Sequence, residues 1–430
     1  MLPPLQNFLE SLLPSDQSRP LPSGAPDCAV LLRMDMFGDQ VIFGGFLEKM
    51  RQAWPKTRLV LVAPEVRRHL YEHCPLLNDT IFFDWKTTTN SSKLRGELYA
   101  RINAIRPDYI ISSQFTRCSM TDRIMRYCPA SVRLGITGHN PQVSPKQRER
   151  FDRYFTHLLT IPDFQPSRTE TRICQQVLDL LSIPSAGCQP RVWTSPDDVA
   201  YADKIFRESG FAPDRTLIFF SGSTSKLRAY PPLKNLVADL VREGPWSIIV
   251  IGSQADFPHG EPPDEDLRPR WLNLCGLNTI RESAELMRRS QLVLGVETGL
   301  AQVACAVDAP HVLLVSGAYF GRFLPASAKS SIVIQPLNCY FCLGECPYKE
   351  AYCLTQIPPA VFRRAVDDAL AGPSDRARVY LAENPADFPE GTAPRPEPHW
   401  QDDWIDERAV ELIRVPVSSP FGACTGDRVE

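Results

Sequence analysis

The chain has 430 residues, of which 43% are hydrophobic and 23% are charged, and its formal net charge is −3. These values are ordinary for a globular protein, so they exclude a collagen-like, coiled-coil or wholly disordered chain. The near-neutral charge argues against a general binder of nucleic acid or anionic membranes, and the 40 prolines are too many for an all-helical protein. At this length we expect two or three domains, each with its own core.

Residues 1–27 are predicted to form an N-terminal segment and linker. They lack the basic start and apolar stretch of a secretion signal, and no part of the chain has the roughly 18 uncharged apolar residues of a membrane-spanning helix. The 13 scattered cysteines then favour reduced thiols and a cytoplasmic location. Phe8, Leu9, Leu12 and Leu13 form one face of a short helix, which either docks on protein or contacts the inner face of a membrane peripherally.

Residues 28–185 are predicted to form a first domain in which apolar strands alternate with amphipathic helices. Such alternation indicates a parallel sheet with helices on both faces. We expect strands near residues 29–33, 58–64, 79–84 and 108–114, and helices at 41–54, 66–74 and 93–105.

The same alternation begins again after a linker, and residues 190–360 are predicted to form a second domain. Strands are expected at 216–222, 246–253, 291–297 and 311–317, with helices at 231–244, 283–290 and 298–308. A last helix is expected at 361–372, followed by an extended Pro- and acid-rich tail at 373–430. The predicted fold is therefore α/β, with two Rossmann-like domains whose parallel sheets face a central ligand-binding cleft.

The turn after the first strand carries the first candidate for chemistry. Gly38 permits close approach of the backbone, and Asp39 falls in the first turn of the next helix, where the helix dipole keeps a carboxylate ionised. A carboxylate held in a ligand-binding cleft can act as a general base. The alternative is that Asp39 is only a favourable charge at a helix start.

A loop at residues 221–228 follows a strand of the second domain and combines small hydroxyl residues, a glycine, Lys226 and Arg228. Its hydroxyl and N–H groups can bind a diphosphate, while the cations offset the charge of a leaving nucleotide. The spacing is not that of a Walker loop. The alternative interpretation is a solvated basic loop.

A second strand-to-helix turn lies at residues 294–302 and is rich in Gly and Thr. Backbone N–H groups at the start of a helix can bind a phosphate or sugar hydroxyls, and Glu297 is a candidate for holding a sugar or ribose hydroxyl. Thr298 can instead be a simple helix cap.

Four cysteines are concentrated within residues 339–353, at Cys339, Cys342, Cys346 and Cys353. Four thiolates can surround one ion tetrahedrally, and such a site leaves no open position for substrate. We therefore predict a structural zinc or iron ion, with unliganded thiols and disulfides as the alternatives.

Taken in order, these elements resemble glycosyltransferase family 9, the ADP-heptose:lipopolysaccharide heptosyltransferases, over roughly residues 28–370. The family's R-x-D-x-x-G-D opening is matched by residues 33–39, and the hydrophobic helix that follows ends at Pro55, as in the family. Residues 221–232 are similar to its Gly/Ser loop and basic Pro turn, and residues 273–282 to its N-L-x-G-K-T-S-L-x-E segment.

The resemblance implies a GT-B fold and an inverting glycosyltransferase whose catalysis needs no metal or other cofactor. It implies that a heptose-like sugar moves from a nucleotide-sugar donor, of the ADP-heptose type, to a hydroxyl of a glycan, a lipopolysaccharide core or a protein. Asp39 matches the family's catalytic base. The implied donor-binding residues are Ser223, Lys226, Arg228, Glu297, Thr298, Gly299 and Gln302.

Three donor-side positions differ from the family pattern. In place of the Asp and His at the two ends of the family's D-T-G-x-x-H signature, this chain has Glu297 and Gln302. Leu277 replaces the lysine of the G-K-T segment. These changes keep open a non-catalytic nucleotide-sugar-binding or assembly protein, and an epimerase, on the same fold.

One subgroup of the family glycosylates autotransporter adhesins, binds iron through a similar cysteine-rich loop and assembles into rings. The resemblance to this subgroup implies a metal at the four cysteines and a homo-oligomer.

Overall fold

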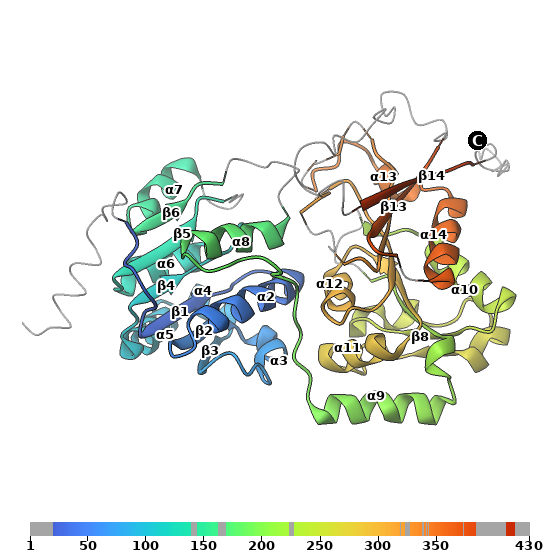
Figure 1. Ribbon diagram of the computed structural model, residues 1–430, viewed down its shortest axis with the longest axis horizontal. Helices are drawn as coiled ribbons and strands as arrows, with labels where there is room; N and C mark the ends of the chain where they lie inside the picture. Colours follow the sequence, from blue (N-terminus) through green and yellow to red (C-terminus); the bar gives the residue numbers. More distant parts are fainter. Residues whose placement is uncertain are drawn as a thin grey trace, which may run out of the picture. The chain divides into compact units, whose positions relative to one another are not determined.

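The computed structural model describes residues 20–138, 144–161, 169–222, 228–318, 320–322, 327–337, 339–340, 342, 344–372, 374–383 and 410–417. The chain divides into two units between Trp193 and Thr194 (Figure 1). No helix in these ranges is both long and apolar enough to cross a membrane.

The first unit is built on a six-stranded parallel sheet with the order β3-β2-β1-β4-β5-β6. Its strands are β1 (Cys28–Leu32), β2 (Arg58–Pro64), β3 (Asp79–Phe83), β4 (Tyr109–Ile111), β5 (Val132–Ile136) and β6 (His157–Leu159). The chain moves outward from β1 to β3 and then returns to place β4 on the other side of β1. The strand order therefore reverses between β1 and β4, where open parallel sheets bind ligands at the carboxyl ends of their strands.

Both faces of this sheet are covered, because successive side chains of a strand point to opposite faces. Val30 and Leu32 of β1 pack in one cluster with apolar side chains of α5 and α6, and Ala29 and Leu31 point the other way and are equally buried. The helices are α2 (Phe37–Ala53), η1 (Glu65–Arg67), α3 (Arg68–Tyr71), α4 (Trp85–Asn90), α5 (Ser92–Ile105), α6 (Ser119–Tyr127), α7 (Pro145–Asp152) and α8 (Glu170–Leu180).

Helix α2 packs against α8 and against the chain that leads out of the first unit. Gly44 and Gly45 make this close approach possible, since a Cβ at either position would overlap backbone atoms of Gln189 or Arg191. The contact fixes α2, and with it the turn between β1 and α2.

The second unit contains an eight-stranded parallel sheet with the order β14-β13-β12-β11-β10-β7-β8-β9. Its strands are β7 (Thr216–Phe220), β8 (Ser247–Val250), β9 (Trp271–Asn273), β10 (Leu292–Val296), β11 (His311–Leu314), β12 (Ser330–Val333), β13 (Ala377–Ala382) and β14 (Val410–Val415). Here the strand order reverses between β7 and β10, so a ligand site is expected where these two strands end.

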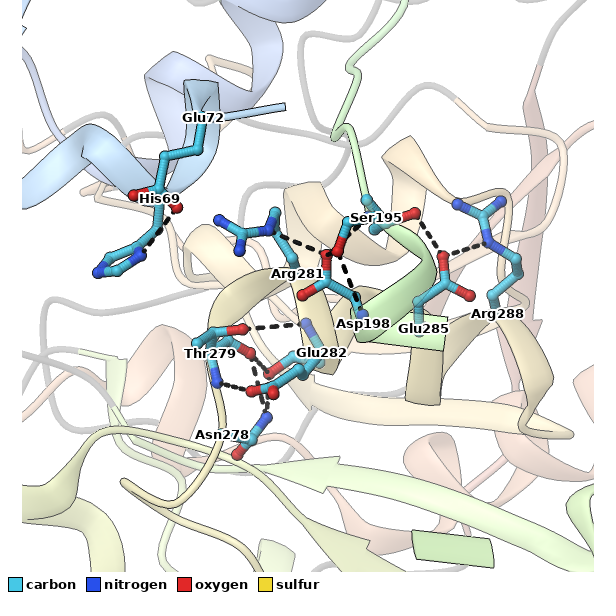
Figure 2. A network of polar contacts seen from close by, with 12 residues as sticks. His69, Glu72, Ser195, Asp198, Asn278, Thr279, Arg281, Glu282, Glu285 and Arg288 are labelled. Atoms are coloured by element: carbon cyan, nitrogen blue, oxygen red, sulfur yellow. Dashed lines mark hydrogen bonds and ion pairs between the residues drawn. The ribbon is translucent and has the colours of Figure 1, made fainter. Parts of the chain in front are cut away.

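Helices of the second unit are tied together by a polar network (Figure 2). Thr194 donates to Glu285 Oε1 at 2.7 Å, and Arg281 Nε donates to Asp198 Oδ2 at 3.0 Å, which joins α9 to α11. The helices are α9 (Pro196–Ser209), η2 (Pro213–Arg215), α10 (Leu233–Glu243), η4 (Gln254–His259), η5 (Glu265–Arg270), α11 (Ile280–Arg289), α12 (Gly299–Ala306), α13 (Tyr352–Thr355) and α14 (Pro359–Ala371).

The structure confirms the predicted α/β fold with two parallel sheets, and it changes the prediction for the C-terminal end of the chain. Residues 373–430 were predicted to be an extended tail, yet β13 and β14 lie in that range and extend the second sheet beyond β12. Each of these strands has only six residues, and a parallel strand gains its hydrogen bonds from a partner that is distant in sequence. Residues 1–19, with the predicted apolar face, lie outside the described ranges.

Candidate functional site

The candidate site of the first unit lies at the reversal of strand order, where β1 ends and α2 begins. Arg33 directly follows β1, and its side chain is completely buried. Arg33 Nη1 donates to Ser113 Oγ at 3.0 Å across the reversal, since Ser113 follows β4. Its Nη2 donates to the main-chain oxygen of Asp39 at 3.0 Å, and the guanidinium lies 4.7 Å from the ring centre of Phe43.

Three carboxyl groups surround this guanidinium. Asp35 Oδ2 lies 2.8 Å and Glu170 Oε1 3.4 Å from Arg33 Nη2. One oxygen from each of Asp35, Asp39 and Glu170 lies within 4.8 Å of the other two. At this separation two ionised carboxylates repel each other by about 3 kcal/mol, at the effective dielectric constant that suits protein sites. A single arginine therefore does not balance three negative charges.

Burial raises the pKa of Asp35 to about 8, against the attraction of Arg33 and with the help of the negative charges of Asp39 and Glu170. The Asp35 side chain is only 8% exposed, so water does little to stabilise its ionised form. Perturbed carboxyl groups of this kind are concentrated at functional sites. The three acids also meet the spacing of a cation site, but Arg33 already supplies a positive charge to them, and we assign no metal here.

Asp39 was predicted as the catalytic base, and the structure places it at this reversal, in the first turn of α2 and 7% exposed. Glu170 was not among the predicted site residues, yet it lies at the start of α8 and is fully buried beside Arg33. The local sequence around Glu170 gives no sign of this role, because Glu170 contacts Arg33, which is 137 positions away in the chain.

In the second unit, the two predicted donor elements meet at the reversal between β7 and β10. Arg228 follows β7, and its Nη1 donates to the main-chain oxygen of Glu297 at 3.4 Å. Glu297 follows β10, and Gly299 opens α12, so the N–H groups at this helix start lie beside a cation. A cation beside a helix N-terminus suits a phosphate group.

Two side-chain oxygens of this turn are buried without a hydrogen-bond partner among the described residues. They are Oγ1 of Thr298 and Oε2 of Glu297. Thr298 stands at the N-cap of α12, yet its side chain makes no capping hydrogen bond, so the simple capping role does not hold. Burial raises the pKa of Glu297 to about 7, with Arg228 acting in the opposite direction. Gln302, one turn further along α12, is also buried.

The remaining donor-side predictions have different outcomes. Ser223 and Lys226 lie outside the described residues. Leu277, at the family's lysine position, is 59% exposed and follows Gly276, whose φ of +73° favours glycine. The loop therefore presents an apolar side chain to its surroundings where the family pattern has a cation.

The four clustered cysteines line one small cavity, together with residues 316–318, Tyr348 and residues 351–352. Cys353 is buried, and its sulfur accepts a hydrogen bond from the Gly317 N–H at 3.3 Å. Burial raises the pKa of the Cys353 thiol to about 12. The donor set suits zinc or iron, but within the described part of the chain no three of these sulfurs are close enough to share an ion, so binding would draw them together.

The fold is the GT-B-like α/β fold with two parallel sheets. Within it, residues 165–352 match the model of glycosyltransferase family 9 (heptosyltransferase), a range that contains α8 and strands β7 to β12. No curated protein sequence matches the chain.

Three solved structures are similar to this chain. The glycosyl transferase family 9 protein from Veillonella parvula DSM 2008 has 20% identity and a TM-score of 0.68, with 80% of this chain and 97% of that chain covered. The E. coli ADP-heptose LPS heptosyltransferase II has 16% identity and a TM-score of 0.61, with 80% and 98% covered. The E. coli heptosyltransferase WaaC with ADP-2-deoxy-2-fluoro heptose has 14% identity and a TM-score of 0.58, with 79% and 99% covered. At these identities the likeness establishes the fold.

Proposed function

We propose that the protein is an inverting glycosyltransferase of the family 9 type, which moves a heptose-like sugar from an ADP-heptose-type donor to a hydroxyl acceptor. The observation that carries this proposal is the meeting of Arg228 with the turn at Glu297, Thr298 and Gly299, where the strand order of the second sheet reverses. The family match to residues 165–352 supports it, because this range contains those residues.

In this proposal each unit contributes one half of the chemistry. Asp39 removes the proton from the acceptor hydroxyl as that oxygen attacks the anomeric carbon. The bond from the anomeric carbon to the diphosphate breaks in the same displacement, which inverts the configuration. Arg228 and the N–H groups at the start of α12 stabilise the negative charge that develops on the leaving diphosphate. Ser223 and Lys226 are assigned to the same donor by the sequence alone.

The donor assignment predicts that an ADP-sugar binds and that Arg228→Met weakens this binding by about 10- to 100-fold, since hydrogen bonds to charged groups contribute about 1.5–3 kcal/mol. Isothermal titration calorimetry with ADP-, GDP-, UDP- and CMP-sugars measures the dissociation constants of wild type and variant. Arg215→Met is the matched control, because Arg215 is exposed and lies at the opposite end of β7.

Three results would contradict the proposal in different ways. Absence of binding by every nucleotide sugar would remove the donor site. Tight binding without transfer to glycan, lipopolysaccharide-core or protein acceptors would favour the non-catalytic binding or assembly protein. Sugar conversion in the absence of any acceptor would instead indicate an epimerase.

We also propose that Cys339, Cys342, Cys346 and Cys353 hold a structural zinc or iron ion. Their common cavity supports this, and so does the N–H group of Gly317 that points at the Cys353 sulfur. The ion would join the cysteine loop to the end of β11 and take no part in catalysis, because four thiolates leave no position for substrate.

Elemental analysis of the purified protein should find about one zinc or iron per chain. Cys353→Ser should remove that metal and lower the melting temperature, since a metal bound only by the folded state stabilises it. Cys188→Ser is the control, because Cys188 is equally buried but lies in the first unit, outside the cavity. Wild-type protein without metal, or equal metal in the two variants, would refute the site.

A cytoplasmic location is part of the proposal. None of the 12 cysteines in the described part of the chain forms a disulfide, which suits a reducing compartment. The homo-oligomer, the peripheral membrane contact and the relation to the autotransporter subgroup stay predictions from the sequence.

A further inference from the structure

We propose that Asp35 retains the one proton shared by the three clustered carboxyl groups, and that as a neutral acid it donates a hydrogen bond that orients the Asp39 carboxylate. Asp35 is then a positioning residue for the base, and it does not itself touch the reacting atoms. This inference rests on the proposed function and deepens it, because it concerns how the same site prepares its base.

The balance of charge requires a proton in this cluster. Asp35, Asp39 and Glu170 have mutually close oxygens, and all three side chains are almost completely buried. Arg33 pairs with Asp35 and Glu170, and Arg67 acts on Asp35 and Asp39 through its charge, with no ion pair to either among the described residues. Two positive charges against three carboxylates leave one negative charge in excess, and protonation of one acid removes it.

The other groups that act on Asp35 do not supply the missing charge. The groups in question are Tyr71 on α3 and Cys174 on α8. Burial raises the pKa of both well above their ordinary values, so both are neutral at physiological pH. The excess negative charge therefore has to be removed within the carboxyl cluster.

Hydrogen bonding indicates that Asp35 is the acid that keeps the proton. Asp35 Oδ2 lies 2.8 Å from Arg33 Nη2, whereas Asp35 Oδ1 is buried and has no hydrogen-bond partner among the described residues. An ionised carboxylate is poorly stabilised with one bare, buried oxygen, whereas a protonated Oδ1 becomes a donor. One carboxyl oxygen of Asp39 and one of Glu170 lie within 4.8 Å of an Asp35 oxygen, and these are the candidate acceptors for that proton.

The raised pKa of Asp35, at about 8, agrees with this assignment and gives a pH range for its test. Between about pH 4 and pH 8 the folded protein holds a proton that the unfolded chain releases, so Asp35 favours folding most at low pH. That contribution is lost as the pH rises through about 8. Ionised Asp35 also stops donating to Asp39, so the transfer rate should fall over the same range.

The test compares Asp35→Asn, whose amide still donates a hydrogen bond, with Asp35→Ala, which cannot. Transfer activity should be about tenfold higher in the Asn variant than in the Ala variant, as expected for one hydrogen bond to a charged group. The alkaline fall in the pH–rate profile should be present in wild type and absent in the Asn variant. Asp79→Asn, an exposed change on β3, should keep the wild-type profile.

Melting temperatures from about pH 5 to about pH 9 give a readout that does not depend on activity. The Asn variant should become more stable relative to wild type as the pH rises. The inference is overturned if the Asn variant loses stability equally at every pH, because Asp35 would then be an ionised partner of Arg33. If no transfer is found at all, the proposed function fails, and the melting profile still decides where the proton resides.

Discussion

Asp39→Asn should lower the turnover number for sugar transfer by about 10²- to 10⁴-fold, the usual contribution of a general base. The side-chain amide of Asn is too weak a base to remove the proton from the hydroxyl of the acceptor substrate. The substitution should leave the fold intact, because Arg33 holds the main-chain oxygen of Asp39 at 3.0 Å and an amide leaves that bond in place. Steady-state kinetics at saturating donor measures the effect.

The control for this prediction is Glu48→Gln, which changes the other acidic residue of α2 at the far end of the helix. Its turnover should match wild type. Donor affinity should be the same in both variants, since Asp39 lies in the unit that does not hold the donor turn. Transfer by the Asn variant within about threefold of wild type would exclude Asp39 as the base.

Arg33→Met should lower the free energy of unfolding by about 3–5 kcal/mol, the range measured when one partner of a buried ion pair is removed. Arg33 is fully buried, and its loss leaves the cluster of Asp35, Asp39 and Glu170 without the cation that contacts it, so the negative charge of the cluster is no longer balanced. It also removes the link to Ser113 across the reversal of strand order. Urea unfolding curves measure the change.

Arg58→Met is the matched control, because Arg58 pairs with Asp79 on the same sheet at 3.4 Å while both side chains are about half exposed. Exposed pairs contribute about 0–1 kcal/mol, so this control should be nearly neutral. The deficit of the Arg33 variant should shrink as the pH falls, because protonation removes the uncompensated negative charges. A deficit below about 1 kcal/mol at neutral pH would show that the cluster does not depend on Arg33.

Much of the site was predictable from local sequence, because its elements follow the ends of strands. Asp39, Arg228 and the turn at Glu297 lie in the segments that follow apolar runs, which the structure confirms as β1, β7 and β10. Parallel sheets bind ligands at the carboxyl ends of their strands. A strand followed by a polar turn is therefore enough to mark these positions without any knowledge of the strand order.

The partners of those residues were not predictable in the same way. The sequence marked Asp39 as a lone carboxylate, whereas the structure surrounds Arg33 with Asp35, Glu170 and Ser113. Ser113 and Glu170 follow Arg33 by 80 and 137 positions. No periodicity or spacing along the chain encodes contacts at such distances.

The sequence by itself determined the alternation of strands and helices, the division into two α/β units and the turns that carry the candidate chemistry. Each of these depends on side-chain pattern within a few neighbouring residues. Only the tertiary structure decided that β13 and β14 extend the second sheet, and that three acids and one buried arginine lie together in the first unit. Strand order and burial create these features, because they bring distant residues together and remove them from water.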